Sequence, residues 1–262
     1  MSAEMSGKAV CYDKKDSIGL ITLNQPCSTE TINTQAVYDE LAGIRDEICY
    51  DPDIRVVLIT GEGVGALSIA AALDDHYATE VTEDAIKRHS ICDIIGRFEQ
   101  LVIIGLDGDA VGQGLEMALA CDIRIASETS HFGLPQIKAG HIPWDGGTQR
   151  LSRLVGKGKA LEMILTGEVI DAQEALRMGL VHRIVSATEL REAAMKTARE
   201  MASKSPVALR YAKEAVYKGM DMTLEQGLRL EADLYLLIHT TKDRTEGIQA
   251  FLEKRKPQFE GR

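Results

Sequence analysis

The stretch that decides the fold is Gly105–Arg150, GLDGDAVGQGLEMALACDIRIASETSHFGLPQIKAGHIPWDGGTQR. It follows the apolar, β-branched run Leu101–Ile104, which predicts a buried strand ending at about the first residue of the stretch. A glycine-rich turn follows at residues 108–114, and residues 115–120 have the composition of a helix. The sequence therefore predicts a strand, a glycine turn and a helix N-terminus in direct succession.

This turn is a candidate site for chemistry. Unpaired N–H groups and the helix dipole at such a helix N-terminus stabilise an anion or a developing oxyanion. Glu116 lies in the first helical turn, where a carboxylate can act in catalysis or only satisfy the helix terminus. A nucleotide fingerprint is weak here, because Met117 occupies the third glycine position of G-x-G-x-x-G. The sequence also contains no P-loop or zinc-binding pattern, so we expect no metal site.

At these residues the sequence resembles the crotonase, or enoyl-CoA hydratase/isomerase, superfamily. The similar segments extend over nearly the whole chain and comprise Gly112–Asp122, Phe132–Pro135, Gly140–Pro143, Gly146–Leu151 and Leu165–Val181. The resemblance implies an α/β fold with a crotonase-like ββα spiral core in residues 1–186, which holds an acyl-CoA site. It further implies a C-terminal helical trimerisation region in residues 187–262.

Composition limits the classes of partner. The chain has 262 residues and a formal net charge of −10, which argues against a binder of nucleic acid or of membrane surfaces. Its five cysteines are odd in number and lack metal-binding spacing. No signal peptide or membrane-length apolar run is present in the sequence, so we expect a cytoplasmic protein.

Local patterns predict the elements before the central stretch. Two short apolar runs, Val10–Asp13 and Ile18–Leu23, flank a charged turn and predict a β-hairpin. Apolar residues at spacings of three and four predict helices over Thr34–Tyr50 and Thr82–Gln100. Between these helices, Arg55–Thr60 predicts a buried strand. The order strand, helix, strand implies parallel pairing through a right-handed crossover.

The C-terminal part is predicted to be helical from about Ala187, with a break at Ser205–Pro206. Ser186, Thr188 and Thr223 are the candidate N-caps. In the resembled family this tail builds trimers that pair into hexamers. The resemblance implies that Phe251 and Lys254 approach the CoA of a neighbouring subunit.

The resemblance also implies a shared chemistry, in which two backbone N–H groups stabilise a thioester enolate. These would be the N–H groups of Ala71, which would also contact CoA, and of Gln113. A side chain at Gln113, where the family has glycine, predicts a backbone angle that glycine adopts more easily. Backbone contacts at Thr31 and Ile32 would bind the adenine region of CoA.

Hydratases of the family use two glutamates around one water. Glu116 matches the first, but Gln136 occupies the position of the second, and a glutamine amide orients water without exchanging protons near neutral pH. We hypothesise that Asp145 takes over part of the acid/base work and that Trp144 walls a pocket for a bulky or cyclic acyl group. The alternative is that Asp145 caps the following turn or helix.

We therefore expect an enoyl-CoA hydratase-type lyase of fatty acid metabolism that adds water to an unsaturated CoA thioester, with cyclic or dienoyl substrates included. No cofactor is expected beyond the CoA that forms part of the substrate. One alternative is a hydrolase of the same fold, acting on a CoA thioester or a β-keto C–C bond. The other is a catalytically silent binding protein. Gln113 and Gln136 would favour it, together with Glu30, which stands where the resembled family tends to be basic and would disfavour a phosphate of CoA.

Overall fold

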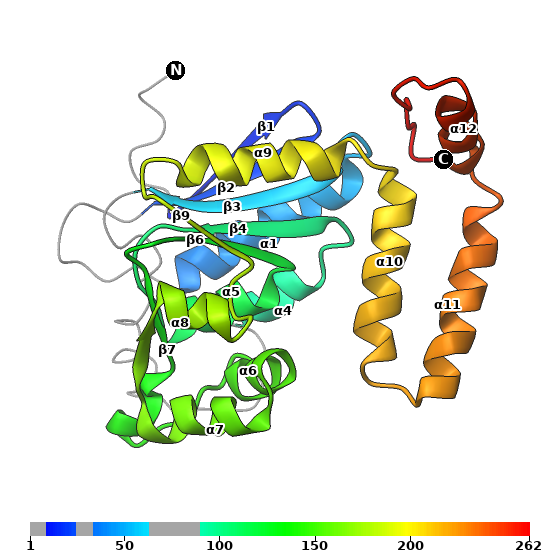
Figure 1. Cartoon of the computed structure of the whole chain (residues 1–262). Helices are drawn as coiled ribbons and strands as arrows, with labels where there is room; N and C mark the ends of the chain where they lie inside the picture. Colours follow the sequence, from blue (N-terminus) through cyan, green and yellow to red (C-terminus); the bar gives the residue numbers. More distant parts are fainter. Residues whose placement is uncertain (1–8, 25–33, 63–89) are drawn as a thin grey trace, which may run out of the picture.

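The computed structural model describes residues 9–24, 34–62 and 90–262. It has two sheets with helices packed around them, and a helical arm at the C-terminal end (Figure 1). The strands are β1 Val10–Lys15, β2 Ile18–Asn24, β3 Val56–Glu62, β4 Leu101–Leu106, β5 Ala110–Val111, β6 Ile123–Ser127, β7 His131–Gly133, β8 Val169–Asp171 and β9 Arg183–Val185.

The helices among these residues include the predicted Thr34–Tyr50, which is confirmed with its bounds unchanged. The described helices are α1 Thr34–Tyr50, α4 Ile91–Gly96, α5 Gln113–Ala120, the short 3-10 helix η2 Pro135–Ala139, α6 Gly147–Val155, α7 Lys157–Thr166, α8 Ala172–Arg177, α9 Leu190–Ala202, α10 Pro206–Gly219, α11 Leu224–Ile238 and α12 Lys242–Leu252.

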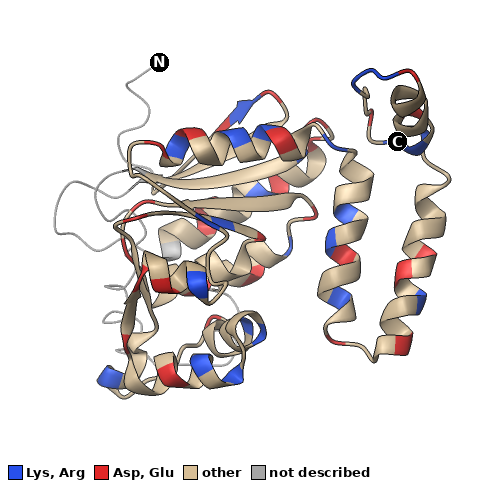
Figure 2. Ribbon diagram, in the orientation of Figure 1, with Lys and Arg blue, Asp and Glu red and all other residues tan. Residues whose placement is uncertain are grey.

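The larger sheet has the order β1-β2-β3-β4-β6-β9. Only β1 and β2 pair antiparallel, across a turn in which Asp16 has φ 57°, and this confirms the predicted hairpin. The pairs β2–β3, β3–β4, β4–β6 and β6–β9 are parallel, as the strand and helix order predicted. Strands β2 and β4 hold no charged residue, whereas charges gather on the outward-facing helices (Figure 2).

Both faces of this sheet are covered, because alternate strand residues pack against different helices. In β3, Val57 and Ile59 join the core cluster of α1, α4 and α5, whereas Val56 and Leu58 pack with α9. Helix α9 lies across the sheet in Figure 1, although the sequence division placed it in the C-terminal region 187–262. The arm that leaves the core begins with α10.

The predicted helix over Thr82–Gln100 is described only from Ser90 onward. There the helix is α4, which has six residues and ends at Gly96. Ile91, Ile95 and Phe98 are buried as the pattern predicted. The short helix is followed directly by β4, so the chain turns at residues 97–100 and does not extend the helix to Gln100.

The smaller sheet, β5-β7-β8, supports the glycine turn. Gly112 N–H donates to the Gly133 carbonyl at 2.9 Å, which joins the end of β5 to β7. A Cβ on Gly133 would lie 2.9 Å from the Glu168 carbonyl oxygen, so only glycine allows this approach. The pairing therefore fixes where α5 begins.

Helix α10 is anchored to the core through a partly buried charge pair. Lys213 Nζ lies 2.8 Å from Asp122 Oδ2 and also donates to the carbonyls of Phe98 and Gln100 at 2.9 Å each. Tyr217 donates its hydroxyl to Asp122 Oδ1 at 2.8 Å. Because these groups satisfy one another away from water, the pair holds the start of the arm in place.

The arm itself exposes many apolar side chains. Helix α10 has no buried residue, and α11 buries only Leu234. The large exposed apolar side chains of the arm are Val216, Tyr217, Met220, Met222, Leu224, Leu228, Tyr235, Leu236, Leu237, Ile248, Phe251 and Leu252. The N-cap at Thr223 is confirmed, and Thr223 forms a capping box with Gln226. Helix α9 instead has Glu189 as its N-cap, so the predicted N-caps at Ser186 and Thr188 are wrong. Ser205, at the predicted break, caps α10.

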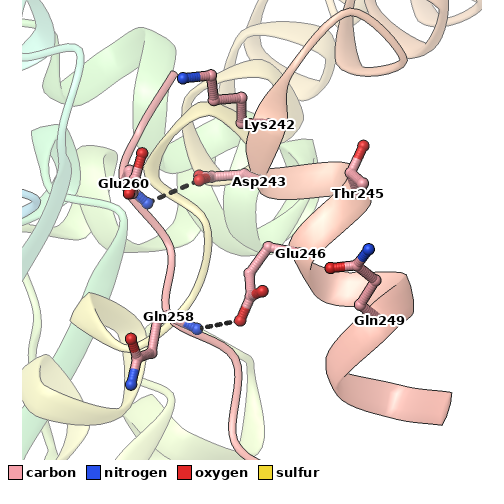
Figure 3. Close-up of a pocket in the computed structure, with 7 residues that line it drawn as sticks. All are labelled: Lys242, Asp243, Thr245, Glu246, Gln249, Gln258 and Glu260. Atoms are coloured by element: carbon pink, nitrogen blue, oxygen red, sulfur yellow. Dashed lines mark hydrogen bonds between the residues drawn. The ribbon is translucent and has the colours of Figure 1, made fainter. Parts of the chain in front are cut away.

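The last residues fold back on α12 (Figure 3). Asp243 Oδ1 accepts from Glu260 N–H at 2.7 Å, and Glu246 Oε1 accepts from Gln258 N–H at 2.7 Å. A pocket of about 280 Å³ lies between the tail and the helix. Asp243 and Glu246, which line this pocket, already accept these hydrogen bonds. The acidic lining of the pocket therefore does not require a ligand.

Candidate active site

Helix α5 begins at Gln113 because Gly112 turns the chain sharply. Gly112 has φ 63° and ψ −127°, a conformation that a residue with a side chain rarely adopts. The only non-glycine residues with positive φ in the described chain are Asp16 and Lys254. The prediction that Gln113 needs a glycine-like angle is therefore wrong, since Gly112 supplies that angle one residue earlier. The Gln113 N–H has no hydrogen-bond acceptor among the described residues.

The far end of α5 is also fixed by a polar group. The Arg124 side chain, 4% exposed, donates to the carbonyls of Ala118 at 3.2 Å and Cys121 at 2.5 Å. A cation at a helix C-terminus interacts favourably with the helix dipole. This arrangement fixes the C-terminal end of α5.

Glu116 is the centre of the site. It is fully buried on α5, and its Oε1 accepts hydrogen bonds from Asp145 N–H and Gly147 N–H at 2.8 Å each. Both donors come from the loop before α6, 29 and 31 residues further along the chain. One oxygen of the carboxylate is thus held by the main chain, which leaves Oε2 as the oxygen available for chemistry.

The burial of Glu116 changes its acidity. Loss of hydration raises the pKa of its carboxyl group to about 7, with a further increase from the negative charge of Asp145. The N–H donors of Gly147 and Asp145 oppose this increase, because they stabilise the carboxylate form. A carboxyl group with this pKa is suited to take up and release a proton near neutral pH.

Gln136 donates a hydrogen bond to the second oxygen of Glu116. Its Nε2 is 3.4 Å from Glu116 Oε2, and its side chain is buried in η2 after Pro135. The carbonyl oxygen of the same amide, Oε1, is buried and has no hydrogen-bond partner among the residues that the structure describes. An unpaired buried acceptor costs about 1–3 kcal/mol, so this atom is suited to bind a donor such as water.

Asp145 is also buried, with 3% of its surface exposed. Its Oδ1 accepts from the hydroxyl of Ser90, the N-cap of α4, and its Oδ2 accepts from Cys92 N–H at 3.2 Å. Burial raises the pKa of Asp145, and these donors oppose the increase. Asp145 therefore does cap a helix, but this is α4, which precedes it in sequence, and not the helix that follows.

Gln113 completes the buried polar group. Its side chain is close enough to the Asp145 carboxylate to lower the pKa of that group, although its Nε2 makes no hydrogen bond of good geometry. The structure thus brings together four of the predicted site residues, namely Gln113, Glu116, Gln136 and Asp145.

Arg150, on α6, binds the loop that carries Asp145. It donates to the carbonyl oxygen of Asp145 at 3.1 Å and lies 3.5 Å from that of Cys92. Gly146, with φ 100°, leaves space for this side chain, since a Cβ there would lie 1.9 Å from Arg150 Nη1. The glycines of Gly146–Gly147 are therefore required both by backbone angle and by space.

The other predicted site residues lie elsewhere. Ala71, Thr31 and Ile32 fall outside the described residues. Trp144 is partly buried on the loop that carries Asp145. Phe251, 83% exposed, is in α12, and Lys254 directly follows this helix. Helix α12 lies on the arm, away from α5 (Figure 1).

Sequence reasoning missed Ser90 and the main-chain donors on Glu116. The pattern Ser90-Ile-Cys-Asp93 is a local N-cap signal, and Ser90 Oγ does accept from Asp93 N–H at 2.9 Å. No local signal connects Ser90 to Asp145, because 55 residues separate them.

In the described part of the chain no cluster of three or more His, Cys, Asp or Glu side chains could hold a metal ion. No helix in that part is long and apolar enough to cross a membrane.

Comparison with known proteins decides the family. The model of the enoyl-CoA hydratase/isomerase family matches residues 13–262. The chain belongs to the enoyl-CoA hydratase/isomerase family. It is 38% identical to the probable enoyl-CoA hydratase echA8 of Mycobacterium tuberculosis over 262 residues, 97% of this chain and 99% of that protein.

Other members of the enoyl-CoA hydratase/isomerase family show the same similarity. The 2,3-dehydroadipyl-CoA hydratase of Escherichia coli is 38% identical over 252 residues, 95% of this chain and 97% of that protein. The crystal structure of enoyl-CoA hydratase from Bacillus anthracis has a TM-score of 0.85 and 35% identity, covering 97% of this chain and all of that one. The chain thus has the crotonase fold and is an acyl-CoA enzyme of the hydratase type.

Proposed function

We propose that this enzyme hydrates a 2-enoyl-CoA thioester with one carboxylate, Glu116, as both base and acid. The observation that carries the proposal is the buried Glu116, with Oε1 held by two N–H groups and Oε2 beside the Gln136 amide. The 2,3-dehydroadipyl-CoA hydratase and echA8 relatives support hydration as the reaction.

In this mechanism the thioester carbonyl accepts a hydrogen bond from Gln113 N–H at the start of α5. The N–H of Ala71 is the second donor by family resemblance. These donors stabilise the enolate that forms when the β-carbon is attacked, because they are already oriented toward the developing charge.

A water bound to Gln136 Oε1 is the nucleophile. Glu116 Oε2 takes one proton from this water as its oxygen bonds to the β-carbon, and the electron pair of the double bond moves into the thioester enolate. Protonated Glu116 then returns the proton to the α-carbon, so one water is added and the carboxylate is regenerated. Gln136 orients the water and Glu116 but carries no proton.

Asp145 is the alternative source of the α-proton. Its buried carboxyl group lies in the same polar cluster and has a raised pKa, which suits an acid. Its two oxygens are bound by donors from α4, however, which favours Glu116 as the group that transfers the proton.

For the acyl group we propose a bulky, cyclic or dienoyl chain, with Trp144 as one wall of its pocket. Trp144 is partly buried and directly precedes Asp145 on the loop that holds Glu116. One relative is a 2,3-dehydroadipyl-CoA hydratase, whose name indicates an acyl group that ends in a carboxylate. The thioesters to be tested therefore include a carboxylated chain.

The test is mass spectrometry of thioesters incubated with the purified protein. The panel contains linear, cyclic, dienoyl and carboxylated 2-enoyl-CoA compounds. Gain of one water on an intact thioester supports the proposal. Release of free CoA or a ring-opened acid instead would indicate a hydrolase, and an unchanged panel would indicate a silent binding protein, which the Gln136 substitution favours.

The pH dependence of kcat/KM should follow Glu116. Because the active form is the carboxylate and its pKa is about 7, kcat/KM is expected to be constant well above this pH. Below it, kcat/KM should fall about tenfold per pH unit, since the free enzyme becomes protonated. Stopped-flow or steady-state rates from pH 5 to 9 measure this. A rate independent of pH between 5.5 and 8 contradicts the assignment.

We propose that the protein assembles into trimers or hexamers through the arm, where Phe251 and Lys254 would reach the CoA of a neighbouring subunit. The apolar side chains on α11, such as Leu224 and Leu228, are more than half exposed in the single chain. Light scattering after gel filtration should give three or six times the monomer mass. Leu228→Asp should reduce that mass, whereas Lys218→Gln, on the exposed side of α10, should not.

A further inference from the structure

Asp145 uses all of its polar groups to connect three parts of the site. Its N–H donates to Glu116 Oε1 at 2.8 Å, and its carbonyl accepts from Arg150 at 3.1 Å. Its carboxylate accepts from Ser90 Oγ and from Cys92 N–H. Asp145 therefore connects helix α4 to Glu116.

We propose that Asp145 is a positioning residue, whose carboxylate binds Ser90 and the first turn of α4 so that its own N–H holds Glu116 in the reactive orientation. This inference rests on the proposed hydration for its kinetic test. It differs from the acid/base hypothesis, because here the Asp145 carboxylate never exchanges a proton with substrate.

The hydrogen-bond pattern favours positioning. Ser90 donates its hydroxyl proton to Asp145 and accepts from Asp93 N–H with the same oxygen, so the serine is oriented on both sides. Cys92 N–H occupies the other carboxylate oxygen at 3.2 Å. Each Asp145 oxygen thus has a donor from α4 before any substrate binds, which stabilises the carboxylate in place.

The connection to Glu116 is rigid for a second reason. Arg150 donates to the Asp145 carbonyl and approaches that of Cys92, so α6 also joins the loop and α4. The charged groups acting on Glu116 are Asp145, which raises its pKa, and Arg150, which lowers it. The titratable Cys92 thiol also faces Asp145, and burial raises the pKa of this thiol. A loop displaced by about 1 Å is expected to reduce turnover on the order of 10²-fold, because Glu116 would move with it.

The decisive variants are Asp145→Asn and Ser90→Ala. Asp145→Asn keeps the shape and one of the two acceptors for α4 but removes the charge. For this variant kcat is expected to fall by no more than about tenfold. Loss of the charge should move the acid limb of kcat/KM to lower pH. Ser90→Ala removes the hydroxyl that holds Asp145, so the N–H of Asp145 should hold the Glu116 carboxylate less well. The pKa of Glu116 should then rise, so the acid limb of kcat/KM should move to higher pH and kcat should fall.

Opposite shifts from two neighbouring substitutions would not follow from a general loss of structure. The matched control is Ser203→Ala, at the exposed end of α9, which should leave rate and pH profile unchanged. Asp145→Ala should lower kcat by a larger factor than it changes KM. If Asp145→Asn is as inactive as Asp145→Ala, Asp145 is the acid and the positioning proposal is wrong.

A readout without turnover separates this proposal from the proposed function. Carbon-13 NMR of Glu116, assigned with Glu116→Gln, follows the titration of the carboxyl group directly. A pKa of Glu116 that falls in Asp145→Asn and rises in Ser90→Ala supports positioning even if no thioester is hydrated. Unchanged pKa values in both variants would overturn it even if hydration is observed.

Discussion

Replacing Glu116 by Gln is expected to reduce kcat/KM for hydration by about 10²–10⁴-fold, because a general acid/base is removed while the shape of the side chain is kept. The carboxamide oxygen can still accept from Asp145 N–H and Gly147 N–H, so the loop should stay in place. Steady-state rates with the best thioester of the panel measure the effect.

Stability provides the control for this variant. Glu116 is fully buried and the pKa of its carboxyl group is raised to about 7, so the protein does not depend on its charge for folding. Urea unfolding of Glu116→Gln should show no loss of stability, and Glu225→Gln, exposed on α11, should keep full activity. If Glu116→Gln retains wild-type turnover, the proposed hydration mechanism is wrong.

Replacing Gly147 by Ala should have a comparable effect through geometry alone. The added Cβ would lie 2.9 Å from Glu116 Oε1 and 2.8 Å from Pro143 Cβ, both closer than real contacts allow. The loop and the carboxylate must separate, which removes or lengthens the N–H contact of 2.8 Å. We expect kcat to fall about 10²-fold and the protein to lose about 1–3 kcal/mol of stability.

The matched control for Gly147→Ala is Gly43→Ala. Gly43 is exposed in the middle of α1, and a Cβ there meets no atom within 4 Å. Alanine at such a helical position should raise the free energy of unfolding by about 0.5–1 kcal/mol and leave turnover unchanged. Full activity in Gly147→Ala would show that the hydrogen bond from Gly147 does not position Glu116.

Several features could be predicted from sequence because they depend on neighbouring residues. The β1–β2 hairpin and helix α1 follow from alternation and helical spacing, and both are confirmed. Glu116 could be located because the glycine turn and the first turn of α5 lie within a few residues of it. The backbone angle predicted at Gln113 is found at the adjacent Gly112, so this difference is only one residue in size.

Other features could not be predicted in this way. Helix α9 has the helical pattern of the C-terminal region, and only the structure shows that its Ala194 and Ala198 pack on the sheet. Helix α4 ends at Gly96, four residues before the predicted end at Gln100, since the chain must turn to enter β4. In both cases packing against the sheet, and not local propensity, decided the outcome.

By itself, the sequence determined the family and placed Glu116 and Gln136 in the motifs that identify it, because motif residues are close together in the chain. Only the tertiary structure decided what surrounds Glu116. Its donors are 29 and 31 residues away, and Ser90 is 55 residues from Asp145. Their burial together is what raises the pKa of Glu116, since loss of hydration arises only when distant segments pack around the group.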